Sequence, residues 1–247
     1  METSPIAIKF KNVSKSYSDR TFLTGGLKNY VLNGFSAGKY SKRHLVLSNI
    51  SFEIRRGTTV GFVGRNGVGK STLLGLIAGI MRPDSGEIAV NGRVSSLLEL
   101  GAGFHPDLSG RENIELYGVV LGFSRAEVRR RIESIIAFSE LAEHIEIPIR
   151  FYSSGMLARL GFAVVSQLDP EILLVDEVLA VGDFSFQAKC NDVIHKFRAS
   201  GGTIVLVSHS AADITQLCDE AFLIENHGIA AAGDPREVME QYQPSGV

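Results

Sequence analysis

Short runs of alternating hydrophobic and polar residues dominate the first hundred positions of the chain. Ile6–Phe10 and Leu45–Ile54 alternate in the manner of half-buried β-strands. Turn signatures at Pro83–Gly86 and Asn91–Gly92 enclose one more short strand, Glu87–Val90. This part of the chain therefore predicts mainly antiparallel strands.

The second half of the chain is dominated by helical spacing and by buried strands. Apolar residues recur with helical spacing between about Gly110 and Gln167, and Ser124 with Glu127 forms a capping box at the start of one helix. Apolar strands and helices then alternate, at Ile172–Val175, Phe184–Ala199, Thr203–Val207 and Ala211–Cys218. This alternation indicates a parallel sheet with crossover helices, in which ligands bind at the carboxyl ends of the strands.

A segment between about Ser18 and His44 fits neither pattern. It contains glycine pairs and scattered aromatic residues, and Leu27–Leu32 is compatible with one short amphipathic helix. A surface excursion without regular structure explains the same residues equally well. Both interpretations stay open at this point.

Composition narrows the class of protein. With 247 residues and 45% hydrophobic content, the chain can bury one core, or one core with a smaller one beside it. The net charge of −2 and the absence of a dense basic stripe give no general attraction for nucleic acid, and Arg129–Arg131 fits a solvated helix face. Two isolated cysteines, Cys190 and Cys218, fit a reducing compartment. We expect no secretory signal and no span of roughly 20 apolar residues.

The most specific motif is a glycine-rich loop between a buried strand and a helix. Thr59–Val63 is continuously apolar, and Ser71–Ala78 begins an apolar-faced helix. The residues between them match G-x-x-x-x-G-K-[ST]: Gly64, Arg65, Asn66, Gly67, Val68, Gly69, Lys70 and Ser71. Backbone amides in such a loop point at phosphate oxygens, Lys70 reaches the β- and γ-phosphates, and Ser71 binds Mg²⁺. The sequence predicts a nucleotide site.

Other candidate residues stand where strands and helices meet. Asp176 and Glu177 end an apolar strand, where Asp176 could hold Mg²⁺ and Glu177 could polarise the attacking water as a general base. His209 ends another strand and could contact the γ-phosphate. Ser153 and the residues up to Met156 open a helix, for which Ser153 is also an ordinary N-cap.

These motifs, in this order, resemble those of ATP-binding cassette (ABC) transporter ATPases from Ile6 to about Tyr242. The finer similarity is to cassettes that export bacterial surface polysaccharides of the O-antigen, capsule, teichoic acid or galactan type. It is carried by the stretches 98–106, 152–156 and 176–183. The resemblance implies a single α/β P-loop NTPase domain over residues 1–247. This domain has a parallel core sheet, an antiparallel β subdomain and an α-helical subdomain at about 100–168.

The resemblance also implies roles for individual residues. Tyr17 looks like the aromatic that stacks on adenine, and Thr72 joins the loop in binding ATP. Ser153, Ser154, Gly155 and Met156 correspond to the signature of one copy that caps the γ-phosphate held by its partner. Asp183 falls in the loop that communicates between the two sites. Glu99 takes the place of the usual glutamine on Mg²⁺, and residues 99–113 correspond to the segment that contacts the membrane partner.

The resemblance therefore implies an ATPase subunit of a polysaccharide exporter that uses ATP and Mg²⁺. We expect a homodimer at the cytoplasmic face of the bacterial inner membrane, bound to separate integral membrane permease subunits and not to nucleic acid. Export of a lipid or drug is the nearest alternative. A soluble cassette ATPase in DNA repair or translation, and an ATP sensor that does not hydrolyse, are the other classes.

Overall fold

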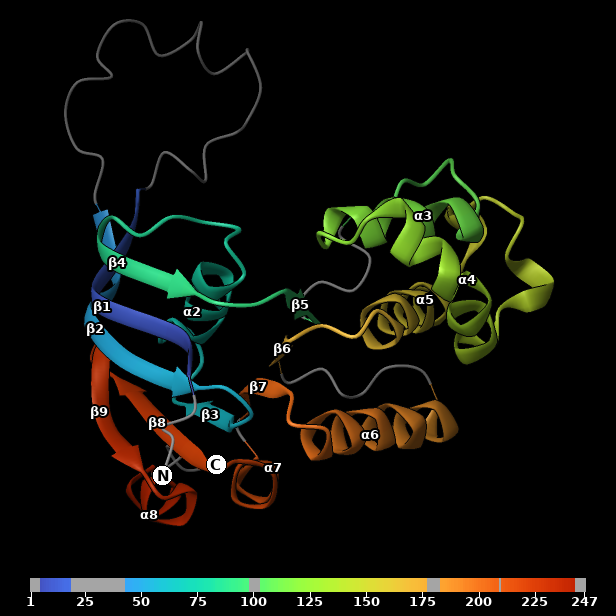
Figure 1. The fold of residues 1–247 in the computed structure, drawn as a ribbon. Helices are drawn as coiled ribbons and strands as arrows, with labels where there is room; N and C mark the ends of the chain where they lie inside the picture. Colours follow the sequence, from blue (N-terminus) through green and yellow to red (C-terminus); the bar gives the residue numbers. More distant parts are fainter. Residues whose placement is uncertain (1–4, 19–42, 98–102, 177–182, 209, 243–247) are drawn as a thin grey trace, which may run out of the picture.

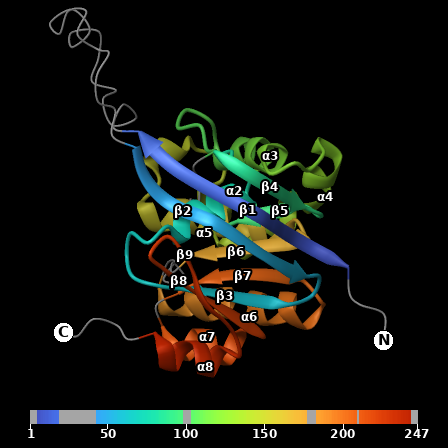
Figure 2. The ribbon, with the colours of Figure 1, turned by 90° about the vertical axis from the view of Figure 1, so that its left-hand side faces the viewer.

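The computed structural model describes residues 5–18, 43–97, 103–176, 183–208 and 210–242. An antiparallel sheet forms one side of the protein, and its strand order is β2-β1-β4. Its strands are β1 (Ile6–Ser18), β2 (Arg43–Arg55) and β4 (Ser85–Val90). Figure 2 shows this sheet facing the viewer, with the larger sheet behind it.

The larger sheet has six strands in the order β5-β6-β7-β3-β8-β9. They are β3 (Thr59–Val63), β5 (Val94–Ser96), β6 (Ile172–Asp176), β7 (Thr203–Val207), β8 (Glu220–Glu225) and β9 (Gly228–Gly233). All neighbouring pairs are parallel except β8 with β9. The carboxyl ends of β3, β6 and β7 therefore meet at one edge.

The helices divide into three groups (Figure 1). α2 (Lys70–Ile77) packs between the two sheets. α3 (Gly110–Val120), α4 (Arg125–Ser139) and α5 (Ser154–Gln167) form a helical block on the side away from the antiparallel sheet. α6 (Phe184–Ala199), α7 (Ala211–Leu217) and α8 (Pro235–Gln241) cover the second face and the end of the larger sheet. Two 3₁₀ turns, Ala142–His144 and Ile149–Phe151, connect α4 to α5.

The larger sheet separates two hydrophobic cores. Along β6, Ile172 and Leu174 belong to the core shared with α2 and the antiparallel sheet, whereas Leu173 and Val175 belong to the core shared with the helices. The alternation follows from the two-residue period of a strand that is buried on both faces. The two cores thus lie on opposite faces of the larger sheet.

The structure confirms the α/β organisation and most expected elements. At the predicted capping box, Glu127 N–H donates to Ser124 Oγ at 3.3 Å and Ser124 N–H donates to the Glu127 carboxylate at 2.8 Å. The pattern analysis did not identify the short strand β5 or the elements β8, β9 and α8. α2 begins at Lys70, one residue earlier than expected.

The two strands that flank the expected excursion at about 18–44 are longer than the sequence pattern predicted. Ser18 pairs with Arg43, so the first two strands extend further than the sequence pattern suggested. The reason is an irregularity in β1, where Asn12 has a φ of 52° and the register shifts between Phe10 and Val13. Such a bulge interrupts the alternation by which a strand is recognised. The expected helix at 27–32 lies outside the described residues.

The arginine run 129–131 lies on an exposed face of α4, as expected. Arg129 pairs with Glu115 and Arg131 with Asp169, both on the exposed side of the helical block. Both cysteines are free and buried, and burial raises the pKa of the Cys190 thiol to about 12. Among the helices of the described ranges, none has the length and apolar character needed to cross a bilayer.

Asp84 fixes the end of β1 to the turn before β4. Its carboxylate accepts hydrogen bonds from Ser16 N–H at 2.8 Å and Ser16 O–H at 2.6 Å, and Lys15 Nζ lies 3.0 Å away. The pKa of Asp84 is lowered from its ordinary 3.8 to about 2. The hydrogen bond from the Ser16 hydroxyl is the largest cause, and the hydrogen bond from Lys15 lowers the pKa further. The clamp holds the strand segment that carries Tyr17.

We predict that Asp84→Asn lowers the free energy of unfolding at neutral pH by roughly 1 kcal/mol or less, because the bonds are partly exposed. The folded pKa is depressed, so this stabilisation is complete above the unfolded pKa and disappears as pH falls from about 4 toward 2. Urea unfolding at about pH 7, 5 and 2.5 measures it. Glu87→Gln, an exposed acid in β4, is the control. A wild-type-to-variant difference unchanged at the lowest pH would contradict the clamp.

Candidate nucleotide-binding site

The loop between β3 and α2 takes a shape that only glycine permits at its key positions. Gly67 has a φ of 80° and Gly69 a φ of 111°, both in the left-handed region. A Cβ at Gly69 would lie 2.9 Å from side-chain carbons of Val46 and Leu47, so the loop also passes close to β2. Gly69 is the N-cap of α2. The backbone amides of the loop therefore continue directly into those of the helix N-terminus.

Lys70 places a cation inside this loop. Its side chain is on the first residue of α2, and the residue is only 7% exposed. Nζ donates to the carbonyl oxygens of Gly64 at 2.6 Å and Arg65 at 3.2 Å. An ammonium has three donors, so a further hydrogen is able to serve an oxygen above the loop. A nearly buried cation at a helix N-terminus is an arrangement suited to an anion.

A cavity of about 510 Å³ opens above the loop. Its walls come from β1, β2, the loop, α2 and the end of β6. They are formed by Tyr17, Val46, Asn66, Gly67, Gly69, Lys70, Ser71, Thr72 and Asp176. The expected residues Gly64, Arg65 and Val68 belong to the loop but do not line the cavity. Val46 was not expected, because its sequence signal is only that of an apolar strand residue.

Two oxygen-bearing side chains meet at the base of the cavity. Ser71 Oγ lies 3.5 Å from Asp176 Oδ2, although the residues are far apart in the sequence. A hydroxyl and a carboxylate are the hard oxygen ligands that Mg²⁺ prefers, and this ion usually completes its shell with water and phosphate oxygens. The donor set therefore fits Mg²⁺ bound together with a phosphate. In the part of the chain that the structure describes, no group of three His, Cys, Asp or Glu residues offers a metal cage.

Tyr17 stands at one wall of the cavity. Its hydroxyl lies 3.2 Å from Thr72 Oγ1 and donates to Met81 Sδ at 3.3 Å. The Lys15 ammonium lies 5.9 Å from the ring centroid. These contacts orient an aromatic ring beside the phosphate loop, and its stacking on adenine stays a prediction.

The expected signature residues open α5 and lie apart from this cavity. Ser153 is the N-cap, and its Oγ accepts from Met156 N–H at 3.2 Å. Ser154 is exposed and is not among the residues with positive φ, so a serine adopts this position without strain. A Cβ at Gly155 would meet Ser153 Oγ at 3.8 Å, an ordinary van der Waals contact. None of these residues lines the described cavity walls.

Asp183 caps α6 and also contacts the signature helix. Its carboxylate accepts from Phe186 N–H at 3.0 Å, and this bond is the main reason that its pKa is lowered. Arg159 of α5 donates to the same carboxylate at 2.7 Å. Arg159 is not among the site residues expected from the sequence. Its signal was a single cation in the otherwise apolar stretch of α5.

Three expected site residues, Glu99, Glu177 and His209, lie outside the described residues. Glu177 follows Asp176, the last residue of β6, and His209 follows Ser208, just after β7. β6 and β7 are neighbours in the sheet, with Asp176 paired with Val207. The roles expected for Glu177 and His209 thus start from adjacent strand ends.

Comparisons with known proteins agree with this geometry. The family model described as ABC transporter matches residues 47–180. An O-antigen export system ATP-binding protein from Klebsiella pneumoniae is 49% identical over 238 residues, covering 96% of this chain and 97% of that protein. A teichoic acids export ATP-binding protein from Bacillus cereus is 38% identical and covers 96% of this chain, which spans 42% of that protein.

Solved structures agree at the level of the fold. An ATP-binding subunit of an ABC transporter superposes with a TM-score of 0.73 at 23% identity, covering 95% of this chain and 92% of that one. A dimeric ATP-binding cassette bound to ADP and Pi gives a TM-score of 0.70 at 20% identity, covering 93% of this chain and 99% of the other. The family match and the relatives together show that the chain belongs to the ABC transporter family.

Proposed function

We propose that the protein is the ATP-hydrolysing subunit of a transporter that exports a cell-surface polysaccharide of the O-antigen type. The ATPase part is carried by the glycine-shaped loop with Lys70 at the base of the cavity. The export part is supported by 49% identity with an O-antigen export ATP-binding protein over almost all of both chains.

ATP binds with its triphosphate over the loop and its adenine against Tyr17. The loop and α2 amides and the Lys70 ammonium bind the β- and γ-phosphate oxygens. Thr72 follows Ser71 in the first turn of α2, and its hydroxyl lies within reach of the Tyr17 hydroxyl. The phosphate and base ends of the site are therefore linked through protein contacts.

Ser71 and Asp176 would hold Mg²⁺ beside the phosphates, with water and phosphate oxygens as further ligands. Bound there, the ion neutralises charge on the β- and γ-phosphates. Glu99 is assigned as an additional ligand in place of the usual glutamine.

Glu177 is assigned as the general base that takes a proton from the attacking water. His209, on the neighbouring strand end, is assigned to contact the γ-phosphate or to orient that water. The position of Asp176 at the cavity supports both assignments, because Glu177 is its chain neighbour and Val207 its partner in β7.

A second copy of the chain completes the site. The described cavity walls come from the sheets, the loop and α2, and none of the residues at the start of α5 is among them. Ser153, Ser154, Gly155 and Met156 at the start of α5 supply amides to the γ-phosphate of the partner copy. Asp183 communicates between the two sites. The two copies close on each other when ATP is bound between them. ATP shifts the equilibrium toward this closed dimer only to the extent that it binds the closed dimer more tightly than the open one.

The pair works at the cytoplasmic face of the inner membrane on separate membrane-spanning subunits. Those subunits dock on the segment 99–113, before and at the start of α3. Closure of the two cassettes moves the membrane subunits. Hydrolysis of ATP, with Glu177 as the base, reopens the dimer. The cargo crosses through the membrane subunits and does not enter the nucleotide site.

Lys70→Ala is expected to weaken ATP binding by about 10- to 100-fold, because it removes one charge-assisted contact with the phosphates. Titration with a fluorescent ATP analogue measures the affinity. In cells, the variant is expected to leave the surface polysaccharide absent. Lys11→Ala, an exposed lysine of β1, is the control. Normal ATP affinity would overturn the nucleotide site, whereas lost affinity with intact surface glycans would overturn only the cargo.

Glu177→Gln keeps the size of the side chain and removes the base. We expect normal ATP affinity, a loss of turnover of about 100-fold or more, and a dimer that persists with Mg²⁺ and ATP. Phosphate release and size-exclusion chromatography provide the two readouts. Glu53→Gln, which alters a surface ion pair of β2, is the control. Turnover at the wild-type rate would remove Glu177 from the mechanism.

A further inference from the structure

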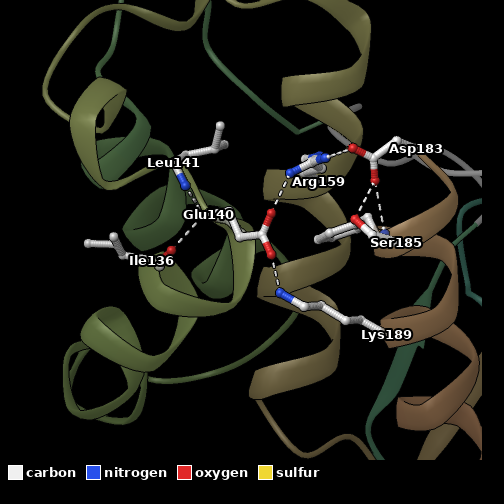
Figure 3. Close-up of polar contacts among 9 residues, drawn as sticks. Ile136, Glu140, Leu141, Arg159, Asp183, Ser185 and Lys189 are labelled. Carbon is white, nitrogen blue, oxygen red and sulfur yellow. Dashed lines mark hydrogen bonds and ion pairs between the residues drawn. The ribbon is translucent and has the colours of Figure 1, made fainter.

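A cluster of four charged side chains joins α4, α5 and α6 outside the nucleotide cavity (Figure 3). Arg159 of α5 stands at its centre. Its Nη1 donates to Glu140 Oε2 at 2.8 Å, and its Nη2 donates to Asp183 Oδ2 at 2.7 Å. Lys189 of α6 pairs with the other oxygen of Glu140. Two cations thus face two carboxylates, and the cluster is electrically balanced.

The Arg159 side chain is less exposed than most of the charged side chains that form ion pairs on the surface. Its side chain is 17% exposed, and the guanidinium carbon lies 4.9 Å from the ring centroid of buried Phe186. A cation removed this far from water needs well-placed partners, and losing one partner is costly. The planar fork of arginine can serve two carboxylates from different elements at once, which the point charge of lysine does less well.

The two oxygens of Asp183 have separate tasks. Oδ1 accepts from Phe186 N–H at 3.0 Å and from Ser185 O–H at 2.9 Å, and these bonds cap α6. Oδ2 accepts from Arg159. Capping therefore does not require Arg159, and the contact to Arg159 serves to join α5 to the start of α6.

The elements joined by Arg159 are those that carry the proposed site. α5 opens with the residues assigned to the partner's γ-phosphate, and Arg159 lies little more than one turn beyond Gly155. Asp183 is the N-cap of α6 and comes seven residues after Asp176 in the sequence. Asp176 lines the cavity. Glu140 is the C-cap of α4 and has a left-handed φ of 60°. Its contact with Arg159 links the end of α4 to α5.

Resting on the proposed function, we propose that Arg159 is a positioning residue for ATP hydrolysis. Through Asp183 and Glu140 it fixes the start of α6 relative to α5 and α4. Phosphate bound by α5 of one copy is thereby coupled to Asp183 of the same copy, the residue assigned to communication between the two sites. The coupling affects turnover in the closed pair and leaves the affinity of the phosphate loop for ATP unchanged.

Two variants test the coupling from opposite sides. Arg159→Lys keeps the charge but loses the planar guanidinium that donates to two carboxylates at once. Asp183→Asn keeps a carbonyl oxygen that can cap α6 but loses the charged acceptor for Arg159. For each, we expect kcat to fall about 10- to 100-fold, the size of effect caused by small misplacements, with ATP affinity within about twofold of wild type. Arg129→Lys, a 64% exposed arginine of α4 paired with Glu115, is the matched control.

The double variant separates positioning from general destabilisation. If both residues act through one contact, the double variant loses little more kcat than either single variant. Thermal unfolding monitors stability in parallel. Wild-type kcat in Arg159→Lys, or losses that multiply in the double variant, would overturn the inference. If the wild-type protein shows no Lys70-dependent ATPase, the proposed function itself fails, and the two failures are thus distinguishable. Should Arg159→Lys fold poorly, Asp183→Asn alone decides.

Discussion

The site depends on one constraint: a nearly buried ammonium must be held inside a loop of backbone amides. Lys70 is held by the carbonyl groups of Gly64 and Arg65, and the loop can take this shape because Gly67 and Gly69 adopt left-handed conformations. The loop is anchored between a strand buried on both faces and a helix buried between two sheets. An anion with several oxygens satisfies this concentration of donors, and a triphosphate matches it chemically.

The rest of the fold serves to bring distant chain segments to that loop. The parallel sheet places Asp176 against Ser71 across more than a hundred residues of sequence. The antiparallel sheet presents Tyr17 beside the same helix, with the Asp84 clamp fixing its strand end. On the opposite side of the larger sheet, Arg159 links the helical block to α6. A buried core thus connects the phosphate loop with the exposed N-terminus of α5.

Much of this arrangement could be predicted from local sequence signals. The phosphate loop, the capping box at Ser124 and the apolar strand ending at Asp176 each combine a pattern of a few residues with a clear physical reason. The common location of the phosphate loop and Asp176 follows from the parallel sheet, whose strand ends must meet. The family resemblance supplied the roles of Tyr17 and of the signature residues, which no local pattern gives.

Other features could not be predicted because they depend on tertiary contacts. The bulge around Asn12 interrupts the alternation of β1, and Val46 lines the cavity only because β2 passes close to Gly69. The contacts of Arg159 join residues from three helices that are distant in sequence. A single cation in an apolar helix signals a buried partner but does not identify it.

The central claim is that a nucleotide held by the loop of one chain is completed by the α5 N-terminus of a second copy. A crystal structure of the protein with Mg²⁺ and a non-hydrolysable ATP analogue tests it most directly. We expect the γ-phosphate between Lys70 of one copy and the Ser154 and Gly155 amides of the other. A triphosphate bound elsewhere, or one contacted by a single chain in a dimer that buries both α5 N-termini away from it, would contradict the account.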